Sequence, residues 1–422
     1  MKNLIYILLL LLPVISFSQN VPTPIKSIDS KNTDFTDLQF LKEHLKGKTI
    51  VGLGEQSHLD GTSFIAKIRL VKFLHEEMGF NVIAFESGLY DCTNANNSID
   101  TATDLHPYLF ESIFGVWRNK EMKELSDYLH KCRETNNPLY LTGFDHQFVG
   151  KWARLNLYKD LTEYIQDVNE QTNTTIEYHP KKLEKALIKL AIYSNHDKKL
   201  RKKDTCILYH ITNQLLRNTK NINSPKANYW RRVLNSIQTD YRIDYYFKGY
   251  PFIERIYRSG MIRDSIMYDN LDYIIKDQYK DQKIILWAAN LHLRKNVALM
   301  ESDKNGSIVK DKNLGVYIRD NYKDKYYFLG ITSYKGLLYK YGPLKIKADI
   351  GDKIGLEEHF HKFKHPYAFI NMKDVKERDL QHFYNSKVFG HASKKCDLYK
   401  ELDGILYIHE LHPSTKIDWK KK

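Results

Sequence analysis

The 422-residue sequence contains only four cysteines, and no two of them form a C-x-x-C pair. That spacing is typical of structural zinc sites, so a zinc site of this kind is not expected. The G-x-S-x-G elbow is also missing, which argues against the common serine hydrolases. The segment GLGEQSH lacks both the G-x-G-x-x-G spacing and the Lys-Ser/Thr pair of phosphate-binding loops. Composition and motifs therefore exclude several frequent enzyme classes.

Beyond its first residues, the chain has no apolar segment long enough to span a membrane. Lys2 precedes the run LIYILLLLLPVISFS, which is too short for a span and is typical of a secretory signal peptide. We expect residues 1–18 to be removed and residues 19–422 to form the mature domain. The mature protein is then exported, to the periplasm or outside the cell, where one disulfide is permitted.

Lysine and arginine outnumber the acidic residues by 65 to 51, which gives a net charge of +14. In an intracellular protein this surplus would raise nucleic acid as a partner. Export argues against it, and the lysines are scattered, as in KKLEKALIKLAIYSNHDKKLRKK. We expect them to form solvated helix faces and expect no nucleic-acid partner.

Short apolar runs without polar alternation recur along the chain, as in strands that are covered on both faces. We predict strands at 49–54, 81–85, 139–144, 283–289, 326–331, 367–372 and 404–408.

A helix is expected between the first two strands. Apolar residues recur there at three- and four-residue intervals from Phe64 to Met78, with Lys67, Arg69 and other polar residues between them, and Gly79 supplies a stop. This β-α-β order indicates a mainly parallel sheet with right-handed crossovers. The fold class is therefore α/β, with a mainly parallel central sheet flanked by helices.

The middle of the chain, from about residue 150 to 280, shows charged helical patterns and no convincing strand. We predict a helical insertion packed over one edge of the sheet. No linker rich in proline, glycine or serine marks a boundary within the domain of residues 19–422.

Polar groups that can carry protons follow four of the predicted strands. Because ligands bind at the carboxyl edge of parallel sheets, we expect these groups to meet. They are Glu55 and His58, Glu86, Asp145 and His146, and Asn290 and His292.

Each of these residues, taken singly, has an ordinary structural explanation. Glu55 would complement the positive start of the following helix, and Asp145 would cap a helix near Lys151. Taken together, they favour an active site. A histidine beside carboxylates can act as a general base on water. The same Glu/His set could instead hold a divalent metal.

The sequence resembles the erythromycin esterase family over nearly the whole mature chain. The resemblance is carried by six motifs in order. They are Gly54, Glu55, Ser57 and His58; Glu86 and Gly88; Trp117, Arg118 and Glu121; Gly143, Phe144, Asp145 and Gln147; Arg263, Asp264, Met267 and Asn270; and Leu314, Gly315 and Gly330.

The resemblance implies ester hydrolysis without a required metal or cofactor. His58 would be the essential base, Glu55 would orient its ring, and the remaining catalytic residues would complete the pocket or stabilise the oxyanion. Those are Glu86, His292, Arg118 and Arg263; Asp145, Asn290 and Trp117 are the expected substrate-binding residues. For both arginines the alternative is a structural ion pair, with Glu86 or Asp264.

The expected substrate is a small-molecule ester or lactone, and a macrolide is one option. Two departures from the family pattern bear on this choice of substrate. Ala289 stands where the family has a histidine, and Leu59 where it has a glycine. Two alternatives stay open at this point: a metal-dependent hydrolase that uses the same residues, and a non-catalytic ligand-binding relative.

Overall fold

The computed structural model describes the larger part of the mature chain. Its described residues are 22–99, 106–193, 200, 202–246, 249–297, 312–339, 345–348, 355–375 and 385–417. The predicted signal peptide, residues 1–18, lies outside this set.

All seven predicted strands are present in one sheet, which is mainly parallel as predicted. The order is β1-β8-β11-β6-β2-β5-β3-β4, with β7 paired to β6. The pairs from β11 to β4 are parallel, whereas β1 and β8 pair antiparallel at the other side and β7 pairs antiparallel with the end of β6. The strands are β1 (Thr23–Pro24), β2 (Ile50–Glu55), β3 (Phe80–Gly88), β4 (Tyr140–Asp145), β5 (Lys283–Ala289), β6 (Tyr326–Tyr339), β7 (Lys345–Ala348), β8 (Tyr367–Asn371) and β11 (Gly404–Leu411).

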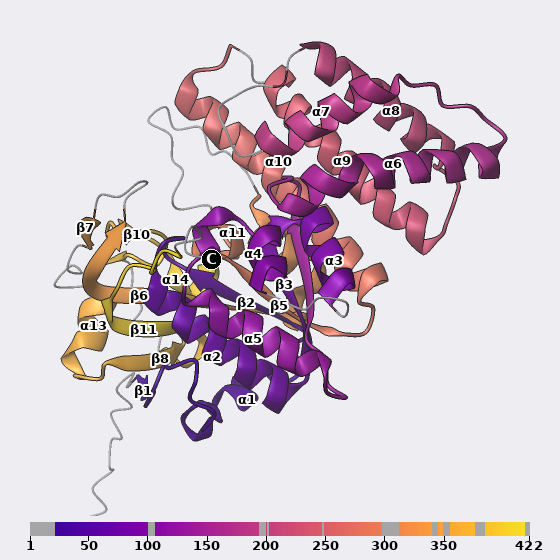
Figure 1. The fold of residues 1–422 in the computed structure, drawn as a ribbon. Coiled ribbons are helices and arrows are strands. Elements are labelled where there is room, and N and C mark those ends of the chain that lie inside the picture. Colours follow the sequence, from indigo (N-terminus) through magenta and orange to yellow (C-terminus); the bar gives the residue numbers. More distant parts are fainter. Residues whose placement is uncertain are drawn as a thin grey trace, which may run out of the picture.

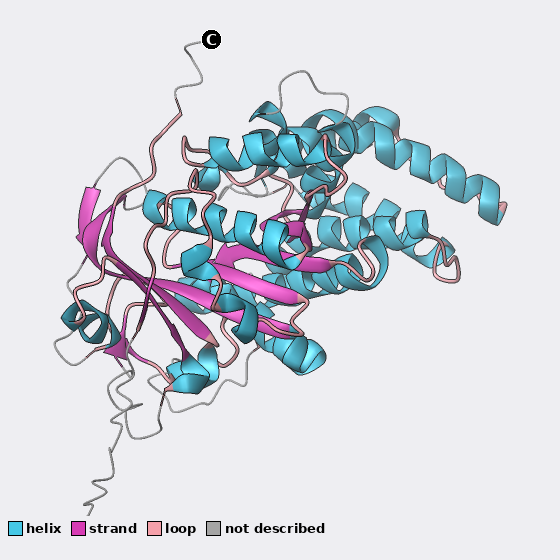
Figure 2. Cartoon of the chain, turned by 90° about the horizontal axis from the view of Figure 1, so that it is seen from below, coloured by secondary structure: helices cyan, strands magenta, loops and turns pink. Residues whose placement is uncertain are grey.

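Helices cover both faces of this sheet, as Figure 2 shows. One face packs on α1 (Leu41–His44), α2 (Gly61–Met78) and α5 (Met122–Arg133). The other packs on α10 (Phe252–Tyr273), α12 (Leu314–Tyr322) and α13 (Leu356–Lys362). Each core strand is therefore buried on both sides, which explains why its sequence does not alternate.

The remaining short elements connect or flank this core. They are α3 (Leu89–Ser98), α4 (His106–Ser112), α11 (Asn290–Leu293), α14 (Leu398–Glu401), and the small hairpin of β9 (Asn385–Ser386) and β10 (Lys394–Lys395).

The helix predicted between the first two strands is present as α2. Asp60 caps its start by accepting a hydrogen bond from the Ser63 backbone at 3.1 Å, and Gly79 ends it with a positive φ of 69°. Three of the basic residues between its apolar positions are not solvated, however. Lys67, Arg69 and Lys72 are all buried, because loops and α5 cover this side of the helix too.

The segment expected to be a helical insertion consists of helices joined by short loops, and its described residues form no strand from 151 to 282. It contains α6 (Lys151–Thr172), α7 (Pro180–Tyr193), α8 (Lys202–Asn218), α9 (Pro225–Tyr246) and α10, which continues into a π-helical turn at Ile274–Gln278. Figure 1 shows these helices gathered in a bundle beside the sheet. The end of α10 returns to the sheet, where the Asn270 amide donates to the Phe144 carbonyl of β4 at 3.1 Å.

Two further expectations concern the thiols and the membrane. Cys92, Cys132, Cys206 and Cys396 are all free, so the disulfide that export would permit is not formed. Among the described helices, none is both long and apolar enough to cross a bilayer.

Candidate active site

The carboxyl ends of four neighbouring strands bring the predicted polar residues together. Strands β2, β5, β3 and β4 are adjacent in the sheet, and they end in Glu55, Ala289, the Glu86–Gly88 segment and Asp145. Glu55 lies opposite Ala289 in the register, and Gly88 lies opposite Asp145. The sequence predicted these residues at one edge of the sheet, and the strands carry them there, whereas their roles stay predictions.

The first group is centred on Glu55, whose side chain is fully buried. Its Oε1 atom lies 3.3 Å from Nδ1 of His58 and accepts a hydrogen bond from Nε1 of Trp117 at 3.0 Å. The His58 ring packs edge-on against Trp117, with the ring centroids 5.3 Å apart. Glu55 and Trp117 thus hold one nitrogen and one side of the imidazole.

His58 differs from its neighbours in its access to solvent. Its side chain is 30% exposed, whereas those of Glu55 and Trp117 are buried. Within the described part of the chain, Nε2 of His58 has no hydrogen-bond partner. Nδ1 is therefore held by the carboxylate of Glu55, and Nε2 is available to a water molecule or a substrate.

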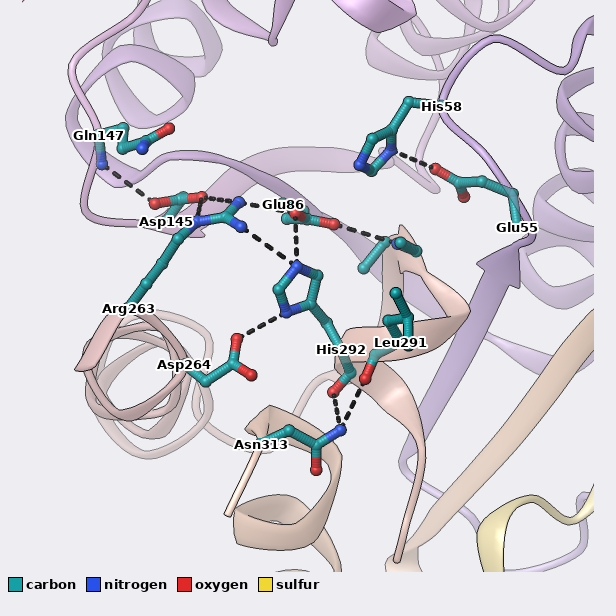
Figure 3. A network of polar contacts seen from close by, with 12 residues as sticks. Glu55, His58, Glu86, Asp145, Gln147, Arg263, Asp264, Leu291, His292 and Asn313 are labelled. Carbon is teal, nitrogen blue, oxygen red and sulfur yellow. Dashed lines mark hydrogen bonds and ion pairs between the residues drawn. The ribbon is translucent and has the colours of Figure 1, made fainter. Parts of the chain in front are cut away.

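The second group is centred on Glu86, which is also buried (Figure 3). Its Oε1 atom lies 2.6 Å from Nη2 of Arg263 and 3.2 Å from Nε2 of His292. Its Oε2 atom accepts the backbone N–H of Ala289 at 3.0 Å. Burial by itself raises the pKa of Glu86, but His292 and Arg263 outweigh it and hold this pKa well below the usual value.

His292 is held at both ring nitrogens. Nδ1 lies 2.6 Å from Oδ1 of Asp264, and Nε2 faces Glu86. Burial lowers the pKa of His292, but the carboxylates of Asp264 and Glu86 raise it to about 10. The imidazole is therefore a cation at neutral pH and donates from both nitrogens.

Arg263 joins the exits of β3 and β4. Besides Glu86 it contacts Oδ2 of Asp145, from Nε at 2.9 Å and from Nη2 at 2.5 Å. Burial lowers the pKa of Arg263, whereas Asp145 and Glu86 raise it above its ordinary value. The side chain is 20% exposed. Arg263 thus forms the predicted ion pair with Glu86 while keeping part of its guanidinium at the surface of the site.

The other predicted residues have different surroundings. Arg118 donates to the backbone carbonyls of Ile113 at 2.9 Å and Val149 at 3.3 Å, and no contact joins it to Glu86 among the described residues. Asn290 is buried and donates to the carbonyl of Ile331 at 2.9 Å. These hydrogen bonds to backbone carbonyls hold the surrounding loops and strands. The catalytic role of Arg118 and the substrate-binding role of Asn290 therefore stay predictions.

Trp117 and Asp145, also expected to bind substrate, are fully buried. Trp117 donates to Glu55, and Asp145 pairs with Arg263 and accepts the backbone N–H of Gln147 at 3.1 Å. Both support residues that lie closer to solvent.

Lys67 is the residue of the site that the sequence analysis missed. It stood among the polar positions of a helical pattern, and nothing in the spacing sets it apart from Lys72. In the structure its ammonium contacts Oε2 of Glu55 and lies 4.1 Å from the centroid of the Trp287 ring. Only the packing of α2 against the sheet reveals it.

The described residues contain no group of three histidine, cysteine or acidic side chains that could hold a metal ion. The carboxylate of Glu86 lies beside Arg263 and His292 instead.

Comparison with known proteins places this chain in a family. A family model described as Erythromycin esterase matches residues 75–411, which is well over half of the chain. The chain belongs to the erythromycin esterase family. It is 28% identical to the protein named "Putative hydrolase YbfO" of Bacillus subtilis (strain 168), over 92% of this chain and 90% of that one. It is 22% identical to erythromycin esterase type II of Escherichia coli, over 91% of this chain and 94% of that one.

A solved structure supports the fold assignment. A mutant of the erythromycin esterase EreC, in its open conformation, superposes with a TM-score of 0.69 at 18% identity, over 94% of this chain and 99% of that one. The α/β architecture with its helical bundle is therefore that of an erythromycin esterase, and family membership supports a hydrolase acting on a small molecule.

Proposed function

We propose that this member of the erythromycin esterase family is an exported hydrolase that cleaves an ester or lactone with water activated by His58. The observation that carries the proposal is the state of the His58 ring. Nδ1 is held by a buried carboxylate, and Nε2, on a partly exposed ring, is open to water. That arrangement suits a general base.

The reaction follows from this geometry. Neutral His58 takes a proton from water at Nε2, while Glu55 accepts from Nδ1–H and stabilises the imidazolium that forms. The oxygen of that water attacks the ester carbonyl carbon and gives a tetrahedral oxyanion. Collapse of the oxyanion breaks the bond to the alkoxy oxygen, which takes the proton from His58. The products are a carboxylic acid and an alcohol, and His58 is neutral again.

The oxyanion requires positive charge at the same strand exits. Arg263 and His292 supply it, because both are cationic at neutral pH and each keeps about a fifth of its side chain exposed. Glu86 fixes both cations in place, so little reorganisation is needed when charge develops. The charge of His58 is among the causes that lower the pKa of Glu86, and this supports a base and cations that act on one substrate.

The substrate class rests on the family and on the departures at Leu59 and Ala289. Macrolide lactones are the first compounds to test, since erythromycin esterases are among the relatives. Export rests on the predicted signal peptide of residues 1–18 and would place the enzyme where such compounds enter.

The test uses the purified mature chain with a panel of small activated esters and macrolides. We expect at least one substrate to be hydrolysed, and His58→Gln to lower turnover about a hundredfold or more, which is the scale of general-base catalysis. His130→Gln, an exposed histidine on α5, is the matched control. Tight binding of a panel member without any hydrolysis would instead indicate a non-catalytic relative.

A further inference from the structure

A buried lysine contacts the same carboxylate as the proposed base. Lys67 is fully buried in α2, and its ammonium contacts Oε2 of Glu55 and the Ala288 carbonyl, the latter at 3.4 Å. Its remaining side faces the Trp287 ring. An ammonium without water is costly unless a counter-charge lies beside it, and removal of one partner of such a pair leaves the other uncompensated.

Glu55 divides its two carboxylate oxygens between different partners. Oε2 serves Lys67, whereas Oε1 serves His58 at 3.3 Å and Trp117 at 3.0 Å. The lysine and the histidine therefore compete for the charge of one carboxylate. A cation at Oε2 draws on the charge of the carboxylate and so reduces the hold of Oε1 on a proton at His58.

We propose that Lys67 is a positioning residue that, through Glu55, sets the orientation and the basicity of His58. Its effect on the His58 ring stands on the contacts alone, whereas its effect on turnover rests on the proposed function. Lys67 touches neither water nor substrate in this scheme.

The charged groups around Lys67 and its burial have opposite effects on its pKa. Glu55, Asp60 and Glu86 all face it, and each favours the ammonium. Burial nevertheless lowers the pKa of Lys67 to about 8, and burial raises the pKa of Asp60 to about 7 against the hydrogen bonds from Ser63. As the pH rises through 8, Lys67 loses its charge, and Glu55 then draws the His58 proton more strongly.

The experiment compares three variants of the full mature chain. Lys67→Met removes the charge and keeps the volume, and Lys67→Arg keeps a charge that does not titrate below pH 12. Lys72→Met is the matched control, because Lys72 is a buried lysine of the same helix that pairs with Glu124 at 2.5 Å, away from the site. NMR of protein with ¹³C-labelled histidine follows the titration of His58, whose signal is assigned as the one missing in His58→Gln.

We expect the midpoint of the His58 titration to rise by about one pH unit in Lys67→Met, which is the low end of the effect of one nearby charge. Lys67→Arg and Lys72→Met should keep the midpoint of the unchanged protein. With an ester substrate, Lys67→Met should lower kcat about tenfold at neutral pH with little change in KM. Lys67→Arg should keep the kcat of the unchanged protein.

An unchanged or lowered midpoint in Lys67→Met, or the same rise in Lys72→Met, would overturn the proposal. If Lys67→Met does not fold, Lys67→Arg decides alone. Loss of the Lys67 charge near pH 8 should shift the His58 NMR signal in the unchanged protein. This shift should be absent in Lys67→Arg. The NMR readout needs no turnover, so absence of any ester hydrolysis would count against the proposed function without deciding the role of Lys67.

Discussion

Arg263 and Asp145, which lie 118 residues apart in the chain, are joined by two contacts to one carboxylate oxygen, at 2.9 Å from Nε and 2.5 Å from Nη2. The arginine comes from α10, the last helix of the bundle, and the aspartate ends β4. This pair therefore fixes the bundle to the carboxyl edge of the sheet at the point where Glu86 and His292 also meet (Figure 3).

Loss of Arg263 should destabilise the protein strongly. Arg263→Gln leaves two buried carboxylates, Asp145 and Glu86, without their shared cation, and breaking such a pair typically costs about 3–5 kcal/mol. We expect a decrease of this size in the free energy of unfolding, measured by urea denaturation. Arg258→Gln is the control, because Arg258 forms a solvent-exposed pair with Glu254 on the same helix and such pairs contribute at most about 1 kcal/mol. Equal effects of the two substitutions would contradict this assignment.

Stability should depend on pH on both sides of neutrality. The folded-state pKa of Glu86 is lowered, so its contribution is present above the pKa of the unfolded chain and is lost as the pH falls toward and through the folded value. The folded-state pKa of His292 is raised to about 10, so its contribution is complete below about pH 6.5 and is lost as the pH rises through 10.

Thermal unfolding between pH 3 and pH 10.5 measures this dependence. We expect a plateau in Tm around neutral pH and a decline on each side. In His292→Asn the alkaline decline should be shallower, since the group that loses its proton there is gone. An alkaline limb of equal slope in both proteins would show that His292 is not a cation in the folded state.

Trp117 should act on catalysis through Glu55. Trp117→Phe keeps an aromatic ring beside His58 but removes the Nε1–H donor and leaves Oε1 of Glu55 one hydrogen bond short. An unsatisfied buried acceptor costs about 1–3 kcal/mol. We expect kcat to fall by roughly tenfold with little change in KM. Trp230→Phe, a buried tryptophan of α9 stacked on Tyr164, should leave kcat unchanged. A larger effect on KM than on kcat would place Trp117 in contact with substrate instead.

Chelation should leave the enzyme active. The carboxylates at the strand exits are occupied by Lys67, Arg263 and His292, so a metal ion would have to displace a cation that is already bound. After treatment with EDTA and dialysis, we expect ester hydrolysis at the rate of untreated protein, with metal content followed by elemental analysis. Activity that is lost on chelation and restored by zinc or manganese would support a metal-dependent hydrolase.

Sequence periodicity was sufficient to predict the α/β class, the strands of the sheet and the helical bundle. Continuous apolar runs such as those ending in Glu55 and Glu86 are typical of strands that are covered on both faces, and the order of strands and helices favours a mainly parallel sheet. The same rule places polar side chains at one edge, because the chain leaves every parallel strand at its carboxyl end.

The sequence by itself thus determined that the polar groups at the strand ends lie along one edge of the sheet, since strand direction is a property of chain order. Only the tertiary structure decided their partners. Lys67 and Lys72 are both lysines between the apolar positions of one helix, yet the first contacts Glu55 and the second pairs with Glu124, away from the site. Arg118 and Arg263 are likewise equal in sequence, yet one donates to backbone carbonyls and the other neutralises two carboxylates. Side-chain pairing depends on which helix face packs against which strand, and that choice is fixed by the burial of the whole core rather than by local spacing.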